Sequence, residues 1–238
     1  MVRKLAYSVS EREHWISAAG GLIGILAVLW SSHFWIDGHG GVLAIASMGA
    51  SAVLLFAAPH GALSQPWPVL GGHLVSALVG VTCARWLGSE PMLAASLAVA
   101  LSIAAMYGLR CLHPPGGATA LFAVLGGESV HALGYGYLFS PVLLNIVVLV
   151  AVAVLFNYPF AWRRYPQSWH RRTQPFVFAM PAEKSMIPHS SLVYALSQID
   201  TFVDISEDDL QRIYALALGQ HHEIADAPVQ SKPAESLR

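Results

Sequence analysis

Four long apolar runs dominate the first two-thirds of the chain, and they leave few folds open to it. They cover residues 15–36, 69–88, 91–109 and 141–158. Each is close to the roughly 20 residues with which a helix crosses a hydrocarbon core. The chain of 238 residues is 55% hydrophobic and 11% charged, which is typical of membrane proteins. Because lipid offers no partner to backbone N–H and C=O groups, we expect an all-α membrane protein.

Two further segments, residues 41–59 and 116–134, are shorter or diluted by glycine and polar residues. They fit either complete crossings or half-helices that enter the membrane and turn back. Basic residues flank the apolar region on both sides, at Arg3, Lys4, Arg12, Arg163, Arg164, Arg171 and Arg172. The positive-inside rule therefore predicts that both ends are cytoplasmic, which requires an even number of crossings. Six spans satisfy this condition, and so do four spans with two re-entrant segments.

An internal repeat relates the two halves of this region. Residues 49–53, GASAV, align with residues 117–121, GATAL, at a shift of 117 − 49 = 68 residues. Small residues also recur by chance in apolar helices, but the same shift brings the start of the run at 69–88 onto the start of the run at 141–158. We therefore predict two repeats of a long span, a short Gly-rich segment and a second long span. The halves are inverted if the short segments cross the membrane, and parallel if they turn back.

The stretch RCLHPPGGATA, residues 110–120, interrupts the apolar pattern. Proline loses no needed hydrogen bond in a first helical turn, and glycine lets a ligand or another backbone approach closely. The stretch predicts a helix N-terminus whose free N–H groups and partial positive charge favour an anion. The repeat predicts a related end on the other half. The candidate substrate-binding residues are Arg110, His113, Pro114, Pro115, Gly116, Gly117, Thr119, Gly49, Ser51 and His73.

Each of these residue types also has a structural use. Arg110 could extend to the interface and pair with lipid headgroups, because a long side chain near a span end can snorkel. Clusters of Gly, Ala, Ser and Thr can serve helix packing without touching a substrate. His73 and His113 could be hydrogen-bonded polar residues or could line a pore.

Several classes of function find no support in the sequence. Of 11 histidines only His221 and His222 are close neighbours, and no His/Cys cluster falls on one helix face, so we expect no metal site. Paired carboxylates, an activated nucleophile and a GxxxxGK[ST] loop are all missing, so we expect neither an enzyme nor a cofactor. Cys83 and Cys111 lie in or beside apolar segments, which disfavours a disulfide framework. A net charge of −1 offers nucleic acid no basic surface.

Three stretches closely resemble the HPP family of integral membrane proteins. They are LHPPGGATALFAVLGG, which contains His113-Pro114-Pro115, together with MGASAVLLFAAP and QPWPVLGGHLVSALVGV. The similarity runs over about residues 12–165. It implies an integral membrane protein usually described with four transmembrane helices. It also implies a transporter role, with nitrite transport assigned to plastid and cyanobacterial relatives, although family membership alone does not fix a substrate.

Beyond residue 165 the chain becomes polar, and two short amphipathic helices are predicted there. In longer HPP relatives this segment leads into tandem cytoplasmic CBS domains, which we expect this chain to lack. The predicted parts are a transmembrane domain at 1–165, a cytoplasmic linker at 166–188, amphipathic helices at 189–219 and a disordered tail at 220–238.

The principal expectation is a transporter or channel for a small monovalent anion, with nitrite first and nitrate or formate next. The anion would pass the HPPGGAT and GAS motifs, with a proton relayed by His113 or His73. We expect a bacterial inner-membrane protein in contact with lipid, and a homodimer or other homo-oligomer formed through small-residue faces. The alternative is a membrane-embedded scaffold or sensor that binds a soluble partner through its C-terminal helices.

Overall fold

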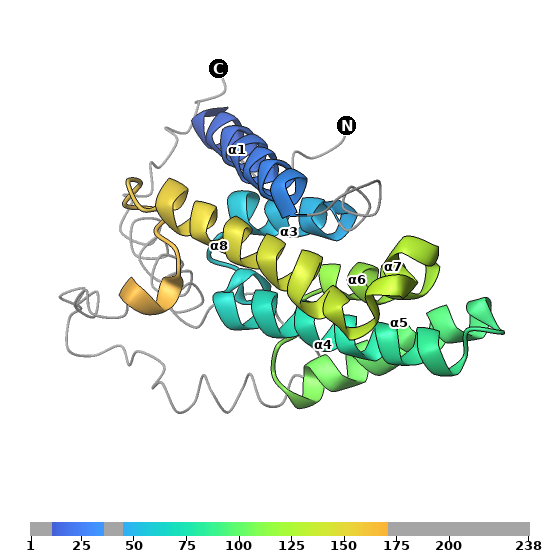
Figure 1. The fold of residues 1–238 in the computed structure, drawn as a ribbon. Coiled ribbons are helices and arrows are strands. Elements are labelled where there is room, and N and C mark those ends of the chain that lie inside the picture. The colour runs from blue at the N-terminus through green and yellow to red at the C-terminus, as the bar shows by residue number, and fades with distance from the viewer. Residues whose placement is uncertain (1–10, 36–44, 171–238) are drawn as a thin grey trace, which may run out of the picture. The chain divides into compact units, whose positions relative to one another are not determined.

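The computed structural model describes residues 11–35 and 45–170, and this part of the chain consists of helices joined by short turns (Figure 1). It contains no strand, which confirms the all-α class. The amphipathic helices predicted at 189–219, the tail at 220–238 and the linker beyond residue 170 lie outside the described residues.

Within the part of the chain that the structure describes, four helical stretches are long and apolar enough to cross a membrane, as the four long runs predict. They are α1 (Glu11–Trp35), α4 (Pro66–Trp86), α5 (Pro91–Gly108) and Glu128–Asn157, which ends in α8 (Leu144–Asn157). The two Gly-rich segments contain shorter apolar helices, α3 (Ile45–Ala57) and α6 (Pro115–Leu125). The remaining short elements are η1 (Ala62–Ser64), α7 (Glu128–Leu133), η2 (Gly134–Leu138), η3 (Phe139–Leu143) and η4 (Gln167–His170).

Proline and glycine set several helix boundaries. α4, α5 and α6 each carry proline in the first turn, where the absent N–H group has no partner within the helix. α6 ends at Leu125 with Gly126 as its C-cap, and Gly127 has a φ of 78°, which glycine adopts at little cost. The predicted segment 116–134 is therefore divided between α6 and α7. After α5, Arg110 has a φ of 54° and is the one described non-glycine residue with positive φ.

The two predicted repeats exchange helices. α1 packs against α3 and α8, while α5 packs against α6 and α4. When the repeat pairs α1 with α5, α3 with α6 and α4 with α8, each of these contacts has a counterpart in the other half. The short helices α3 and α6 also contact each other. The second long helix of each repeat therefore packs with the other repeat, so the halves are intertwined.

A buried arginine joins three helix ends. Arg163 is 1% exposed and forms an ion pair with Glu13 at the start of α1. It also donates to the carbonyl oxygen of Phe56 at the end of α3, to Ser17 Oγ at 3.1 Å and to Asn157 Oδ1 at 3.2 Å. The start of α1 and the ends of α3 and α8 therefore meet at one end of the bundle. In the sequence Arg163 stands out only as a flanking charge, and nothing in the local pattern indicates its burial.

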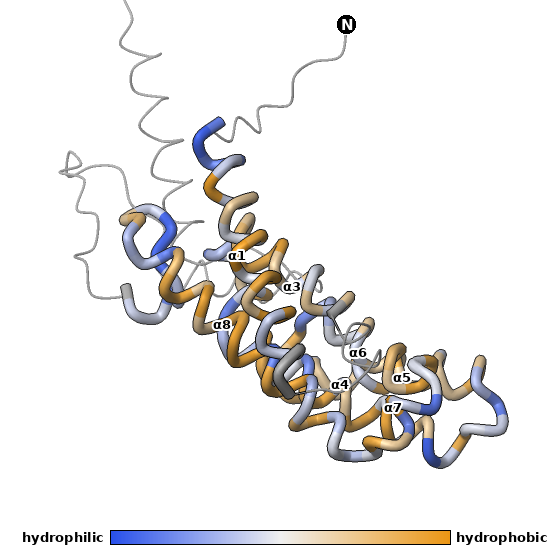
Figure 2. Tube along the Cα trace, turned by 45° about the horizontal axis from the view of Figure 1, so that its top comes forward, coloured by the Kyte–Doolittle hydropathy of each residue, from blue (hydrophilic) through white to orange (hydrophobic). Residues whose placement is uncertain are grey.

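The halves run in opposite directions. The backbone N–H of Gln167, beyond α8, donates to Gln65 Oε1 at the start of α4, 3.1 Å away, so α4 begins at the Arg163 end. α4 finishes at the opposite end, where the Arg85 guanidinium carbon lies 5.4 Å from the centre of the Tyr135 ring. α5 returns after a short turn and α6 reverses again. Figure 2 shows hydrophilic residues at the start of α1 and at the α4–α5 turn. The repeats are therefore inverted, and the parallel alternative is wrong.

The short helices α3 and α6 are each too short to span the hydrocarbon core of a bilayer. At about 1.5 Å per residue, the 13 residues of α3 rise about 20 Å and the 11 residues of α6 about 16 Å, against a hydrocarbon core of about 30 Å. Folded segments adjoin each short helix. Ser64 Oγ donates to the Leu54 carbonyl at 3.2 Å after α3, and Cys111 and His113 are fully buried before α6. Irregular backbone at this depth requires such protein surroundings.

The inverted arrangement predicts that Ser89 and Ser168 are reached from opposite sides of the membrane. Both side chains are exposed, Ser89 in the α4–α5 turn and Ser168 at the Arg163 end. Single cysteines at these positions, treated with an impermeant maleimide in right-side-out and inverted vesicles, should be labelled with opposite sidedness. Labelling of both from the same side would contradict the crossing of α6, the short helix that lies between them in the chain.

Close packing of α4 on α6 depends on glycine. A Cβ atom at Gly80 would lie 2.6 Å from the Ala120 carbonyl oxygen and 2.8 Å from the Ala123 Cβ. A Cβ atom at Gly21 in α1 would meet nothing within 4 Å. Alanine at Gly80 therefore reports the steric cost at the α4–α6 contact. Alanine at Gly21 reports only the gain in helix propensity.

We expect Gly80→Ala to lower the free energy of unfolding by about 1–3 kcal/mol, because the helices must move apart to accept the methyl group. Gly21→Ala should be neutral or stabilising by up to about 1 kcal/mol. Thermal unfolding of the two variants in the same detergent checks this. Equal melting temperatures would contradict the close α4–α6 contact.

Candidate functional site

Four polar side chains from different segments meet in the interior of the bundle. Ser51 comes from α3, His73 from α4, His113 from the turn before α6 and Thr119 from α6, and all four are 0% exposed. Ser51 Oγ lies 2.8 Å from Nε2 of His73 and 2.8 Å from Nε2 of His113. Nδ1 of His73 lies 2.7 Å from Thr119 Oγ1. Nδ1 of His113 lies 2.9 Å from the carbonyl oxygen of Leu63.

These contacts define a continuous hydrogen-bonded series, called the polar chain below, and its last acceptor fixes its direction. The Leu63 carbonyl can only accept, so a neutral His113 carries its proton on Nδ1 and accepts at Nε2 from the Ser51 hydroxyl. Ser51 has one proton to donate, so it accepts in turn from Nε2–H of His73. Nδ1 of His73 is then unprotonated and accepts from the Thr119 hydroxyl. Donation runs from Thr119 through His73, Ser51 and His113 to Leu63.

The polar chain joins the two repeats at equivalent positions. The shift of 68 residues that aligns GASAV with GATAL sets Ser51 on Thr119, since 51 + 68 = 119. These two hydroxyls bond to the two ring nitrogens of the same imidazole, that of His73. The hydroxyls of two inverted short helices are therefore bridged by one histidine, which belongs to the long helix α4.

The backbone around the polar chain is shaped by two glycines. A Cβ atom at Gly72 would lie 2.6 Å from the His113 Cβ, and one at Gly116 would lie 2.8 Å from the Gly72 carbonyl oxygen. These close approaches let α4 bring His73 between the two short helices. Tyr137 of η2 donates to the Thr119 carbonyl at 3.4 Å and covers the far end of the polar chain. Tyr137 is not among the predicted site residues, and no local motif marks it.

The structure brings together four of the ten predicted site residues, namely Ser51, His73, His113 and Thr119. Pro115 and Gly116 are buried beside them at the start of α6. The other four residues lie elsewhere: Pro114 and Arg110 are exposed, Gly117 faces Val99 of α5, and Gly49 lies on α3 away from the polar chain.

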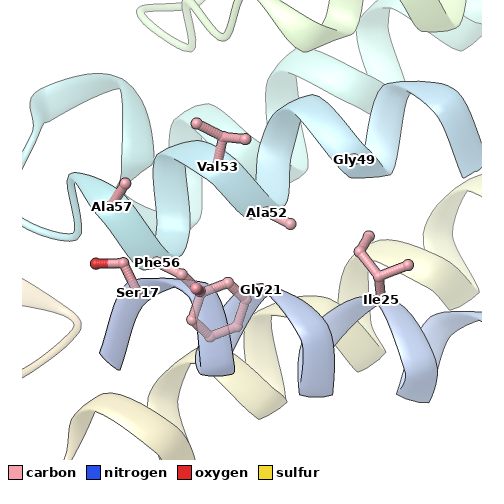
Figure 3. Close-up of a pocket in the computed structure, with 9 residues that line it drawn as sticks. Ser17, Gly21, Ile25, Gly49, Ala52, Val53, Phe56 and Ala57 are labelled. Atoms are coloured by element: carbon pink, nitrogen blue, oxygen red, sulfur yellow. The ribbon is translucent and has the colours of Figure 1, made fainter. Parts of the chain in front are cut away.

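Gly49 lines a separate, apolar groove of about 360 Å³ between α1 and α3, which Figure 3 shows together with Gly21, Ile25 and Phe56. The groove contains little polar surface, and Ser17 at one end is its only hydroxyl-bearing residue. The pairing of Gly49 with Ser51 in one anion-binding end is therefore wrong, because the two side-chain positions point to different faces of α3.

The prediction of free N–H groups at the start of α6 is also wrong. The N–H of Gly116 donates to the His113 carbonyl at 2.8 Å, and that of Gly117 donates to the Pro114 carbonyl at 3.0 Å. Pro114 adopts helical torsion angles, so a tight first turn satisfies the donors that an ordinary helix start would leave free. The chemical groups that α6 offers to a ligand are therefore side chains, above all Thr119.

No carboxylate or guanidinium takes part in the polar chain. Every hydrogen bond of its four side chains goes to another member or to a backbone carbonyl, including Ser47 for Ser51 and Pro115 for Thr119. Within residues 11–35 and 45–170, no group of three or more His, Cys, Asp and Glu side chains is arranged to hold a metal ion. The site therefore combines hydroxyl and N–H groups that donate hydrogen bonds with two imidazoles that can each accept a proton.

The model of one protein family, the transmembrane region of HPP proteins, matches residues 6–166. This chain belongs to the HPP family. The match contains every helix from α1 to α8, including the polar chain, and so confirms the resemblance drawn from the HPP and GAS motifs.

Two transmembrane proteins of Dictyostelium discoideum are similar to this HPP chain, each at 35% identity. One alignment covers 159 residues, 65% of this chain and 50% of the relative. The other covers 158 residues, 65% of this chain and 54% of the relative. The chain thus spans about half the length of these curated relatives. No solved structure gives a significant match.

Proposed function

We propose that this protein carries a small monovalent anion, nitrite first and nitrate or formate next, across the membrane in which its helices are embedded. The observation that supports the proposal most is the bridging of Ser51 and Thr119 by His73. Substrate sites of inverted-repeat transporters lie near the membrane midplane where the repeats meet, and the polar chain occupies the contact between the two halves of this protein.

The chemistry of the polar chain favours an anion over a cation. Hydroxyl and imidazole N–H groups donate hydrogen bonds, whereas no carboxylate of residues 11–35 and 45–170 bonds to the polar chain to attract a cation. Buried polar groups in a membrane protein are costly and commonly mark pathways. We place the termini of the bundle in the cytoplasm, on the positive-inside rule, with Arg163 and Arg164 at that end.

Replacement of His73 tests the assignment. His73→Gln keeps an N–H donor toward Ser51 but removes the acceptor toward Thr119, and we expect anion flux into proteoliposomes to fall at least about tenfold, as loss of one buried hydrogen bond implies. Thr119→Val, similar in shape, should act in the same direction. Nitrite, nitrate, formate and chloride are compared as substrates.

His131→Gln is the matched control. His131 lies in α7, where its Nε2 bonds to the Val124 carbonyl at 2.8 Å, and it takes no part in the polar chain. Anion flux through the His131→Gln variant should therefore equal that of the unmodified protein. Size-exclusion profiles confirm folding of each variant. Undiminished flux in folded His73→Gln would overturn the site, and no protein-dependent flux of any of the four anions would favour the scaffold alternative.

A further inference from the structure

We propose that each anion crosses together with one proton, so that a transport cycle moves no net charge. This inference rests on the proposed function and concerns the same site. It follows from the completeness of the polar chain, in which each donor already has an acceptor, and from the lack of a fixed charge among its partners.

The neutral polar chain has no donor to spare for an anion. Its four donors are the Thr119 hydroxyl, Nε2–H of His73, the Ser51 hydroxyl and Nδ1–H of His113, and each is already used. An anion that enters this state must break a buried hydrogen bond without replacement. It also brings an uncompensated charge into a site with 0% exposure, which is strongly unfavourable in a membrane protein.

One added proton removes both obstacles. A proton on Nδ1 of His73 turns that nitrogen into a donor toward Thr119 Oγ1, and the Thr119 hydroxyl is then free to turn its own proton to an anion. A proton on Nε2 of His113 acts in the same way on Ser51, whose hydroxyl has a second acceptor in the Ser47 carbonyl at 3.2 Å. Protonation therefore creates one donor and one positive charge together.

The site holds one added proton rather than two. The ring centres of His73 and His113 lie 4.9 Å apart, and two imidazolium ions at that distance repel each other. Among the described residues, the titratable groups next to the polar chain include Cys111, two residues before His113, and Tyr137, which donates to the Thr119 carbonyl at 3.4 Å. Both are neutral when protonated, so neither supplies a counter-charge. One proton and one monovalent anion leave the occupied site neutral.

The cycle balances without a further reactant. A proton and an anion enter from one side, the proton forms an N–H bond on an imidazole, and the anion accepts from the released hydroxyl. On the other side the imidazole loses the proton, the anion leaves and the original direction of donation returns. A divalent anion would leave net negative charge in the site, so the substrate class is limited to small monovalent anions.

Proteoliposomes with an imposed membrane potential and an entrapped pH dye test the coupling, with nitrite and nitrate as probes. Empty vesicles provide the blank, because nitrous acid also crosses bare lipid. We expect anion uptake to acidify the interior by one proton per anion. Accumulation should follow the pH gradient, about tenfold per unit, and should not change with potential.

Two outcomes distinguish this inference from the proposed function. Uptake without acidification, with accumulation changing about 50-fold per about 100 mV, would overturn the coupling and leave anion transport intact. Absence of protein-dependent uptake of either probe would overturn both. In folded His73→Gln the acidification per anion should fall, whereas His131→Gln should keep the ratio of the unmodified protein.

Discussion

The hydrogen-bonded series from Thr119 to Leu63 is the constraint on which the rest of the structure depends. Lipid cannot satisfy a polar group, so two imidazoles and two hydroxyls at 0% exposure require partners supplied by the fold. Those partners come from α3, α4, α6 and the turns before α4 and α6. The series therefore requires the two short helices and α4 to meet in one register.

That register in turn requires close contact between the backbones of α4 and α6, and helix ends that are held in place at one end of the bundle. Gly72 and Gly116 allow α4 and α6 to approach, so that the His73 ring reaches both short helices. At the Arg163 end, the guanidinium holds the end of α3 against α1 and α8. The ion pair with Glu13 fixes helix ends at the Arg163 end of the bundle. The neutral polar chain joins α3, α4 and the start of α6 in the interior without net charge.

Much of this fold could be predicted from the sequence, because long apolar runs and an internal repeat indicate it. The four long spans follow from the lengths of their apolar runs, and the match of GASAV to GATAL predicted the equivalence of Ser51 and Thr119. The exchange of α4 and α8 between repeats, by contrast, depends on packing of side chains far apart in the chain. The burial of Arg163 depends on Glu13, 150 residues away, and no local pattern predicts it.

The four residues of the polar chain were named from the sequence, but the contacts between them were not predicted. Ser51, His73, His113 and Thr119 were all selected, but as lining for an anion held by helix N–H groups and Arg110. The tight turn at Pro114 uses those N–H groups, and Arg110 is exposed beyond α5. Which hydroxyl bonds to which ring nitrogen depends on distances of a few tenths of an ångström, which residue spacing does not encode.

The most direct test of this account is the tautomeric state of the two imidazoles, measured by solid-state NMR of protein labelled with ¹⁵N-histidine in lipid bilayers. At neutral pH the account predicts His73 with its proton on Nε2 and His113 with its proton on Nδ1, assigned by loss of each signal in His73→Gln and His113→Asn. The opposite tautomer at His73, or a doubly protonated ring at either position without added anion, would contradict the directed chain.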